Sequence, residues 1–213
     1  MPDFVRARSD EQREERLKEI KDITEKMILE TSYHEISLAT IASSLGWSRA
    51  TLYKYVSTKE EIILEILADK HIKQSNEIIT ACPIGSNFDH ETISSIWAGI
   101  INSNKDYLTY YSLLQVILET NVSLEKLVKF KKIFYRYNGM VIEHFAEYLN
   151  CTPDTFAKVY SSVFFHALGL NGVCTVNPIA KEASKLAGFK DIPVDFIESM
   201  KKFILMCIHE YIS

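Results

Sequence analysis

Glycine and proline are scarce in this chain, with seven glycines and five prolines among 213 residues. Because both residues interrupt helices, their scarcity favours long helical segments. The cysteines are few and scattered, and Cys82, Cys151, Cys174 and Cys207 show none of the paired spacings of a metal site. We therefore expect reduced, mostly buried thiols, no bound metal and no other cofactor.

Long hydrophobic runs are also missing. No stretch approaches the roughly 18 apolar residues that cross a membrane, and the first residues form no apolar signal core. We expect a cytoplasmic protein with no membrane partner. The net charge of −4 argues against indiscriminate coating of nucleic acid, but it is compatible with one basic patch.

The common catalytic motifs are missing as well. The sequence has no phosphate-binding glycine loop, no His-Glu-x-x-His zinc motif and no serine nucleophile elbow. Glu143 and His144 are adjacent, but neighbouring side chains on a helix diverge, so they are a poor catalytic pair. We expect no enzyme; a helical enzyme assembled from distant residues is the alternative of another class.

Carboxylates are absent from one segment, residues 36–59, although they are plentiful elsewhere. Between Glu35 and Glu60 lie 24 residues without an acid, and the only formal charges there are Arg49, Lys54 and Lys59. We call residues 36–59 the acid-free segment. Such a surface suits a negatively charged partner, and nucleic-acid phosphate is the natural one.

The acid-free segment has the pattern of two short helices joined by a tight turn. Ser37 and Ser48 stand where helix caps are expected, and Gly46 can adopt the left-handed conformation that ends the first helix. Residues at helical spacings form the buried faces: Leu38, Ile41, Ala42 and Leu45, then Leu52, Tyr55 and Val56. With a basic, hydroxyl-rich outer face on the second helix, this pattern predicts a helix-turn-helix.

The next helix is predicted to begin directly after the motif. Thr58 and Glu61 fit a capping box, with the glutamate reaching back to the cap. Lys59 then lies in the first turn, where the helix dipole disfavours a cation by about 0.3–1 kcal/mol. A cation in an unfavourable place suggests a use, so we expect Lys59 to contact DNA phosphate rather than to be a solvated surface lysine.

The run from Ser37 to Ile62 resembles the DNA-binding region of the TetR family of bacterial transcriptional repressors. The matching residues are Thr40-Ile41-Ala42, Leu45-Gly46, Ser48 through Tyr53, and Thr58 through Ile62. Two positions depart from the family pattern and remain apolar. Trp47 stands where a smaller aliphatic residue is usual, and Val56 stands where phenylalanine is usual.

The resemblance implies an all-α dimer whose second domain binds a small molecule and controls operator affinity. We expect a three-helix DNA-binding domain at residues 1–58 and a helical effector-binding and dimerisation domain at residues 59–213. Residues 59–82 would form the connecting helix. Repression of transcription follows from the resemblance alone.

The outer face of the second motif helix divides into base-reading and phosphate-binding residues. Arg49 is expected to contact a base edge, because its fork can bond two acceptors of guanine. Ser48, Ala50 and Thr51 would tune neighbouring base contacts. Phosphate is the expected partner of Thr40, Tyr53, Lys54 and Lys59.

Helical periodicity continues through the rest of the chain. We expect a supporting helix over residues 10–31, and further helices over 59–82, 89–103, 106–120, 123–149, 153–173 and 194–212. Residues 175–193 are less regular, with room for a short helix before Gly188. The second domain is therefore predicted to be a helical bundle without a sheet.

The last long helices carry broad apolar stripes, and in the resembled family these helices form a four-helix dimer interface. The expected interface residues are Phe156, Tyr160, Val163, Ala167, Phe196, Met200, Phe203, Ile204, Cys207 and Ile208. Gly169 and Gly172 would permit close approach. An internal core is the alternative for each of these residues.

Aromatic side chains with a few polar groups, suitable for lining a small-molecule cavity, are frequent in the second domain. They are Trp97, Tyr107, Tyr110, Tyr111, Phe134, Tyr137, Asn138, His144, Phe164 and His166. The expected effector is mostly apolar or aromatic, although an ordinary core would contain the same residues. The sequence thus predicts a ligand-released repressor that binds a palindromic operator as a homodimer. A helix-turn-helix protein controlled by a protein partner is the alternative, favoured if the second-domain core is filled.

Overall fold

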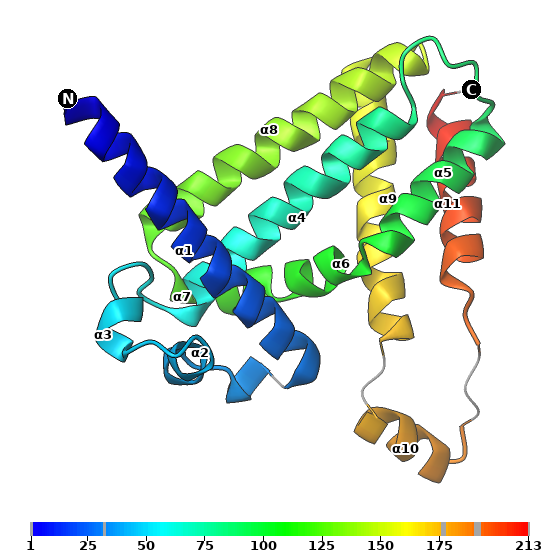
Figure 1. The fold of residues 1–213 in the computed structure, drawn as a ribbon. Helices are drawn as coiled ribbons and strands as arrows, with labels where there is room; N and C mark the ends of the chain where they lie inside the picture. The colour runs from blue at the N-terminus through cyan, green and yellow to red at the C-terminus, as the bar shows by residue number, and fades with distance from the viewer. Residues whose placement is uncertain (1, 32, 176–177, 190–192, 213) are drawn as a thin grey trace. The chain divides into compact units, whose positions relative to one another are not determined.

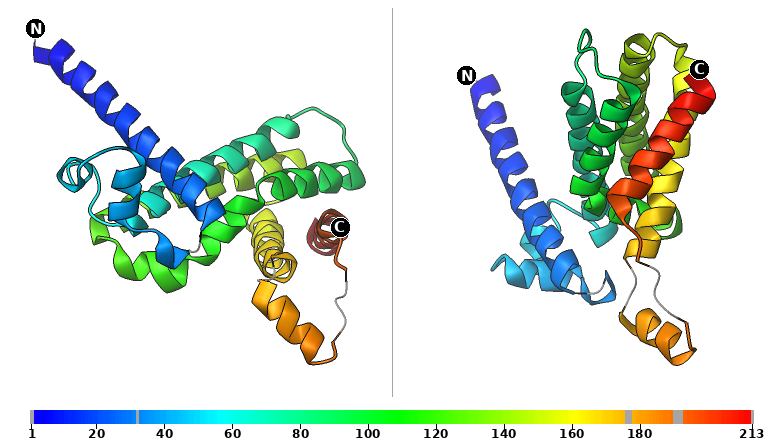
Figure 2. Two further views of the ribbon diagram at one scale, coloured as in Figure 1. Left: turned by 60° about the horizontal axis from the view of Figure 1, so that its bottom comes forward. Right: turned by 90° about the vertical axis from the view of Figure 1, so that its right-hand side faces the viewer.

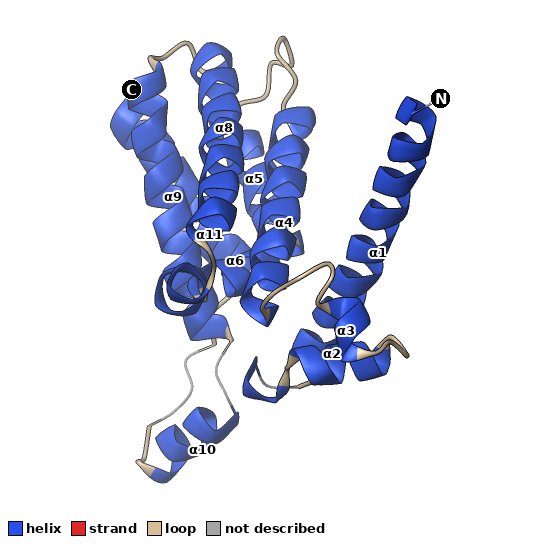
Figure 3. Ribbon diagram, turned by 90° about the vertical axis from the view of Figure 1, so that its left-hand side faces the viewer, coloured by secondary structure: helices blue, strands red, loops and turns tan. Residues whose placement is uncertain are grey.

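The structure is a computed structural model that describes residues 2–31, 33–175, 178–189 and 193–212, and every regular element in them is helical (Figure 1). The α-helices are α1 (Pro2–Glu30), α2 (Leu38–Ser44), α3 (Arg49–Leu52), α4 (Lys59–Ala81), α5 (His90–Ser103), α6 (Lys105–Ser112), α7 (Glu119–Asn121), α8 (Leu124–Tyr148), α9 (Pro153–Cys174), α10 (Pro178–Leu186) and α11 (Phe196–Ile212). A 3-10 turn, η1 (Tyr33–Glu35), and a π-helical segment, η2 (Leu114–Leu118), complete the order. No strand occurs among these residues, which confirms the predicted all-α fold (Figure 3).

The chain divides into two compact units. The first contains Met1–Asp69 and Leu113–Lys132, and the second contains Lys70–Ser112 and Ile133–Ser213. This division falls inside α4 and α8, and the domain boundary expected at residue 58 stays a prediction. The first half of α4 belongs with the N-terminal helices because side chains bond them together. Lys21 of α1 pairs with Asp69 of α4.

The first unit has an apolar core drawn from its N-terminal helices. Ile20 of α1, Ile41 of α2, Leu52 of α3 and Ile63 of α4 are all fully buried. Burying a side chain of this size contributes about 1.5–3 kcal/mol to stability. The short helices α2 and α3 are therefore held in place mainly by packing, because isolated helices of that length are unstable in water.

Hydroxyl caps start the two motif helices, as the sequence predicts. Ser37 Oγ accepts from the Thr40 N–H at 3.2 Å, and Thr40 Oγ1 accepts from the Ser37 N–H at 2.9 Å, which completes a capping box. Ser48 Oγ accepts from the Thr51 N–H at 3.1 Å at the start of α3. Both caps satisfy backbone N–H groups that have no partner inside the helix.

The end of α2 is set by Gly46, whose φ of +68° lies in the left-handed region. The Trp47 N–H bonds to the Ala42 carbonyl at 2.8 Å, and the Gly46 N–H bonds to the Ser43 carbonyl at 3.1 Å. These two bonds form a Schellman motif, which closes the helix and redirects the chain into α3. The predicted helix, glycine turn and helix are confirmed.

Stacked aromatic rings fill the core of the second unit. Trp97 of α5 stacks on Phe145 of α8 and on Phe156 and Tyr160 of α9, with ring centroids 5.8–6.2 Å apart. Phe145 and Phe156 also stack on each other at 5.2 Å. We call these four residues the aromatic stack. The final helix, α11, packs against α5 and α9 (Figure 1 and Figure 2), so the unit is a helical bundle, as predicted.

The helix expected over residues 106–120 is broken in the structure. The α-helix α6 ends at Ser112, the π-helical η2 follows, and α7 has only three residues. A π-helical turn takes more residues than an α-helical turn, so it shifts the register that an α-helical sequence pattern assumes. The first helix also differs from expectation, because it begins at Pro2 rather than near residue 10. The less regular segment contains the short helix α10 ahead of Gly188, as expected, and the φ of Gly188 is +84°.

The apolar stripes of α9 and α11 form internal core rather than a free surface. Most members of the expected dimer interface are at most 4% exposed in the single chain: Phe156, Val163, Ala167, Phe196, Met200, Ile204, Cys207 and Ile208. Within the single chain these residues therefore belong to the internal core, because α11 packs against both α5 and α9. Their place in a dimer interface stays a prediction. Tyr160 and Phe203 are half-buried.

The cysteines are free thiols, and Cys82 and Cys207 are buried whereas Cys174 is exposed. Burial raises the pKa of the Cys82 and Cys207 thiols, which disfavours the reactive thiolate. Among the described residues no group of His, Cys, Asp and Glu could hold a metal ion. No single helix in the same residues has the length and hydropathy of a membrane span; α9 and α10 together reach them, across a 69° bend.

Candidate nucleic-acid interface

The outer face of α3 and the turn after it form an exposed surface without acidic residues. Its exposed side chains are Arg49, Ala50, Tyr53 and Lys54. Leu52 and Val56 point into the core, as predicted, whereas Tyr55 is only half-buried. The Arg49 guanidinium offers five donors in a planar fork, a geometry that matches the two acceptors on a guanine edge.

The hydroxyl groups expected to contact DNA also hold the motif together. Thr40 Oγ1 donates to the Ser37 carbonyl at 2.9 Å in addition to its place in the capping box. Ser48 Oγ lies 2.8 Å from Thr51 Oγ1 while it caps α3. The Thr40 hydroxyl proton and one of the two hydroxyl protons of Ser48 and Thr51 are therefore used inside the protein. Contacts of Thr40, Ser48 and Thr51 with DNA stay predictions.

Lys59 is tied to the backbone of the first unit. Its Nζ donates to the carbonyls of Tyr33 and Ile36, each at 2.8 Å, and lies 3.8 Å from the centroid of the Tyr33 ring. An ammonium group has three donors, so two are used within the protein. These bonds explain a cation in the first turn of α4 without a nucleic acid. A phosphate contact through the third N–H stays a prediction.

The start of α4 is capped by Thr58, as predicted, but the Glu61 carboxylate bonds one residue before the cap. Thr58 Oγ1 accepts from the Glu61 N–H at 3.1 Å, as a cap should. The Glu61 carboxylate accepts from the Ser57 N–H at 3.1 Å, rather than from the cap residue itself. The capping box predicted for Thr58 and Glu61 is therefore only half formed.

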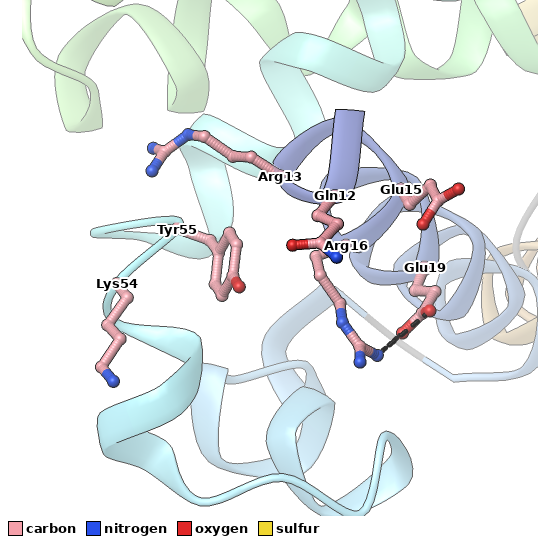
Figure 4. A pocket seen from close by; sticks show the side chains of 7 residues that line it. All are labelled: Gln12, Arg13, Glu15, Arg16, Glu19, Lys54 and Tyr55. Carbon is pink, nitrogen blue, oxygen red and sulfur yellow. Dashed lines mark hydrogen bonds and ion pairs between the residues drawn. The ribbon is translucent and has the colours of Figure 1, made fainter. Parts of the chain in front are cut away.

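A groove beside α3, lined by three basic and two acidic side chains, has a volume of about 570 Å³ and was not revealed by the sequence. It is lined by Gln12, Arg13, Glu15, Arg16 and Glu19 of α1 and by Lys54 and Tyr55 (Figure 4). The Arg16 guanidinium lies 5.2 Å from the centroid of the Trp47 ring, and that of Arg13 lies 5.7 Å from the Tyr55 ring. In sequence these arginines belong to an ordinary charged helix, and only the tertiary structure places them on the rings.

Most of the aromatic residues expected to bind a ligand do meet in the second unit. Tyr107, Tyr111, Phe134 and Phe164 surround one another with centroid separations of 4.7–6.2 Å. We call these four residues, with His71, the ring cluster. Tyr107 and Tyr110 are buried and Tyr137 faces His71 edge-on, whereas Trp97 belongs to the aromatic stack.

His71 is the member of the ring cluster that sequence reasoning missed. Its Nδ1 lies 2.9 Å from the Tyr107 hydroxyl and its Nε2 lies 3.2 Å from the Phe134 carbonyl. A carbonyl can only accept, so Nε2 carries the proton and the Tyr107 hydroxyl donates to Nδ1. Burial lowers the pKa of His71 to about 4, although the bond to the Phe134 carbonyl opposes this. The imidazole is therefore neutral at physiological pH.

The remaining expected ligand residues have structural partners outside the ring cluster. His144 Nε2 donates to the Cys82 carbonyl at 2.7 Å, which ties α8 to the end of α4. His166 stacks face to face on Phe203, with ring centroids 3.8 Å apart. Asn138 Oδ1 accepts from the Tyr160 hydroxyl at 3.0 Å. These contacts account for both histidines as structural residues.

A cavity of about 10 Å³ remains between the ring cluster and the aromatic stack. It is lined by Gln74, Ile78, Trp97, Ile101, Leu108, Tyr160, Val163, Phe164 and Ala167. That volume is close to the minimum for one water molecule. Gln74 is only 7% exposed, and its Nε2 has no hydrogen-bond partner among the described residues. A buried amide without a partner is costly, so this position calls for a water or a ligand atom that accepts a hydrogen bond.

Both units are similar to one family of known proteins. Residues 20–66 match the family described as bacterial regulatory proteins, tetR family, and residues 70–209 match the tetracyclin repressor-like C-terminal domain. The crystal structure of a transcriptional regulator of the TetR/AcrR family from Thermobifida fusca YX-ER1 has a similar fold, with a TM-score of 0.51 and 17% sequence identity. The similarity covers 90% of this chain and 97% of that chain. No curated protein matches the chain.

The family matches agree with the helix-turn-helix that the structure shows. The first match contains α2, α3 and their caps, and the second contains the ring cluster and the aromatic stack. The second match alone spans more than half of the chain. This chain belongs to the TetR family of bacterial transcriptional regulators and carries its helix-turn-helix DNA-binding domain.

Proposed function

We propose that this protein is a transcriptional repressor that binds a palindromic operator as a homodimer and is released by a small molecule. The observation that carries the proposal is the exposed face of α3, where Arg49 and Lys54 stand in a segment without a single carboxylate. One four-residue helix touches few base pairs. A two-fold dimer gains affinity because it presents two such helices to related half-sites.

The DNA-reading role is tested by selecting duplexes from a random pool with the purified protein. Arg49→Ala should lose about 1–3 kcal/mol of discrimination at one position in each half-site. Lys54→Ala is the matched control. It should weaken binding to all sequences alike and make the slope of log K against log salt concentration shallower by about 0.9. An equal loss on every sequence for Arg49→Ala would remove its base-reading role. A wild-type protein that prefers no duplex at low ionic strength would overturn the proposed function.

The homodimer is supported by apolar surface that remains exposed on α9 and α11. Phe165 and Met206 are 67% and 57% exposed. Gly169 and Gly172 follow Phe165 on the same helical face, and a Cβ added at either glycine would meet nothing within 4 Å. Glycine inside a helix costs about 1 kcal/mol relative to alanine. Close approach by a second helix gives these two glycines a use that the single chain does not.

Dimerisation is tested by measuring the mass of the protein in solution. The wild-type protein should have twice the monomer mass at micromolar concentration, and Phe165→Glu or Met206→Glu should halve it. Val116→Glu is the control, because Val116 is 78% exposed but lies in the first unit. A wild-type monomer, or an unchanged dimer in both glutamate variants, would contradict the proposed interface.

Ligand control is supported by the aromatic surroundings of Gln74. An unpartnered amide beside Trp97, Tyr160 and Phe164 offers one hydrogen bond within an apolar site, which is how small-molecule pockets fix orientation. The cavity must enlarge to hold more than a water, so binding is coupled to movement of the surrounding helices. A ligand that favours the enlarged state shifts the population of subunit arrangements and so changes operator affinity.

Release by a ligand is tested with a panel of aromatic compounds, measuring thermal unfolding and operator binding together. A compound that raises the unfolding temperature should also weaken operator binding. Gln74→Leu should reduce that response, whereas Gln115→Leu, at an exposed position, should leave it unchanged. Equal operator affinity with and without every bound compound would remove this mechanism.

Control by a protein partner is the second candidate. It is favoured by the small size of the cavity, since the ring cluster and aromatic stack nearly fill the core. A partner would act on exposed surface and need no cavity. A purified protein that binds its operator and responds to none of the compounds would favour this candidate.

A further inference from the structure

We propose that Arg13 and Arg16 of α1 bind the DNA phosphate backbone beside the recognition helix, held in position by the rings of Tyr55 and Trp47. The inference rests on the proposed DNA-binding function and extends the DNA-contacting surface from the helix-turn-helix to α1. It commits to one partner, the sugar-phosphate backbone of double-stranded DNA.

The four side chains form an alternating series of cations and rings. Arg16 lies over Trp47 at 5.2 Å, the Trp47 and Tyr55 rings are 5.8 Å apart, and Arg13 lies over Tyr55 at 5.7 Å. Trp47 directly precedes the Ser48 cap of α3, and Tyr55 comes soon after α3 ends. The series therefore runs alongside the recognition helix from its start to its end.

The cation–π contacts leave the arginines able to bind an anion. A ring attracts the positive charge of a guanidinium without accepting conventional hydrogen bonds from all of its five N–H donors. The contacts also restrict an otherwise flexible side chain, so less conformational entropy is lost when a phosphate binds. Both arginines are exposed, so their donors can be reached from solvent.

The distribution of charge in the groove also supports phosphate binding by the arginines. Figure 4 shows Arg13 and Lys54 on one side of the groove, with Glu15 and Glu19 at the opposite end. Arg16 lies between them and pairs with Glu19 at 2.9 Å. Both partners of this pair are about half exposed, and such pairs contribute little to stability. A phosphate can therefore replace the glutamate as the partner of Arg16.

This arrangement also gives the aromatic ring of Trp47 a use. An aliphatic side chain would supply the apolar contact after the Gly46 turn, but it would offer no ring face to Arg16. Trp47 is only half-buried, so it is not needed solely as core. Its aromatic face is the feature that a smaller residue could not provide.

The test measures binding to double-stranded DNA of random sequence at several salt concentrations. Arg13→Ala and Arg16→Ala should each weaken binding about tenfold at low salt and make the slope of log K against log salt shallower by about 0.9. Lys18→Ala is the matched control, because it removes the same charge from an exposed position of α1 outside the groove and should leave the slope unchanged. Glu19→Gln should strengthen binding, because it frees Arg16. Trp47→Leu should weaken binding and reduce the further effect of Arg16→Ala.

The outcomes separate this inference from the proposed function. If the wild-type protein binds no duplex, the proposed function fails and the inference fails with it. If the wild-type protein binds DNA but both arginine variants keep its affinity and salt slope, the inference alone is overturned. The same result is expected if the groove binds a small anion instead of DNA. A loss as large for Lys18→Ala would also overturn it, since the effect would then be one of general charge. Circular dichroism checks that every variant keeps the wild-type helix content.

Discussion

The exposed face of α3 and the aromatic stack of the second unit are both carried by helices, but they handle polar groups in opposite ways. Around α3 the charged groups stay in solvent, and the hydroxyls of Ser37 and Ser48 serve the backbone. In the second unit the rings of Trp97 and Phe145 are excluded from solvent. His71 and Tyr107 there are hydrogen-bonded to each other, whereas the Gln74 amide nitrogen has no hydrogen-bond partner among the described residues.

This contrast separates residues that bind from residues that hold the fold. A side chain that must meet DNA stays exposed, so removing it should change affinity much more than stability. A side chain inside the aromatic stack has no access to a partner, so removing it should change stability first. Lys59 and His71 fall between these two classes. The charged group of Lys59 and the titratable group of His71 are both hydrogen-bonded within the protein.

The largest expected effect on stability comes from the aromatic stack. Phe145→Ala should lower the free energy of unfolding by about 3–5 kcal/mol, because Phe145 is fully buried between Trp97 and Phe156. Urea denaturation measures the loss. Tyr135→Ala on the same helix is the control, since Tyr135 is 66% exposed and should change stability by about 0.5 kcal/mol or less. Equal losses in the two variants would break the distinction between core and surface.

His71 should make the second unit sensitive to acid. Its pKa is lowered from 6.5 to about 4 by burial, so the unfolded chain takes up a proton at a higher pH than the folded protein does. The stability that depends on neutral His71 is therefore complete above pH 6.5 and is lost as the pH falls toward 4, by about 3 kcal/mol in total. The difference in unfolding free energy between the wild-type protein and the His71→Gln variant should therefore change in favour of the variant as the pH falls from 6.5 to 4. Parallel curves of unfolding free energy against pH would show that His71 is not linked to folding.

Lys59 should act on stability as well as on DNA binding, which sharpens the contrast with Lys54. Lys59→Met removes two charged hydrogen bonds to the carbonyls of Tyr33 and Ile36 and should cost about 1.5–3 kcal/mol. Lys54→Met, at an exposed position, should change the free energy of unfolding by about 0.5 kcal/mol or less. Thermal unfolding measures both. If the Lys59→Met variant is as stable as the wild-type protein but binds DNA more weakly, Lys59 acts only in phosphate binding.

The smallest expected effect concerns the caps of the motif. Ser37→Ala removes the acceptor for the Thr40 N–H and should lower stability by about 1 kcal/mol. Ser37→Asp should keep most of that stability, because aspartate accepts the same hydrogen bond. Urea denaturation of the two variants measures the difference. Equal stability of both variants would mean that the cap contributes nothing to the motif.

The DNA-binding motif was predictable because its signals are local. The cap at Ser37, the turn at Gly46 and the cap at Ser48 each act over three or four residues, and the structure has them where the sequence places them. The break after Ser112 was not predictable from the same reasoning. The apolar pattern of residues 106–120 predicts one continuous helix. The π-helical turn instead depends on how the surrounding helices pack.

The candidate sites were predictable only in part, because several of their members come from distant segments. His71 and Phe134 are far apart in sequence, and no local pattern links the Phe134 carbonyl to an imidazole. The same holds for Arg16 and Trp47. The apolar stripes on α9 and α11 could be seen in the sequence, but what they pack against could not. A broad apolar face does not reveal whether it contacts its own chain or a partner.

The sequence by itself determined the helical architecture, the helix-turn-helix and the acid-free character of its outer face. Those features depend on composition, spacing and caps, which act between near neighbours along the chain. Only the tertiary structure decided which rings surround His71, which apolar residues remain exposed on α9 and α11, and that the α1 arginines lie on Trp47 and Tyr55. Those features depend on contacts between helices far apart in the chain, whose packing a one-dimensional pattern does not specify.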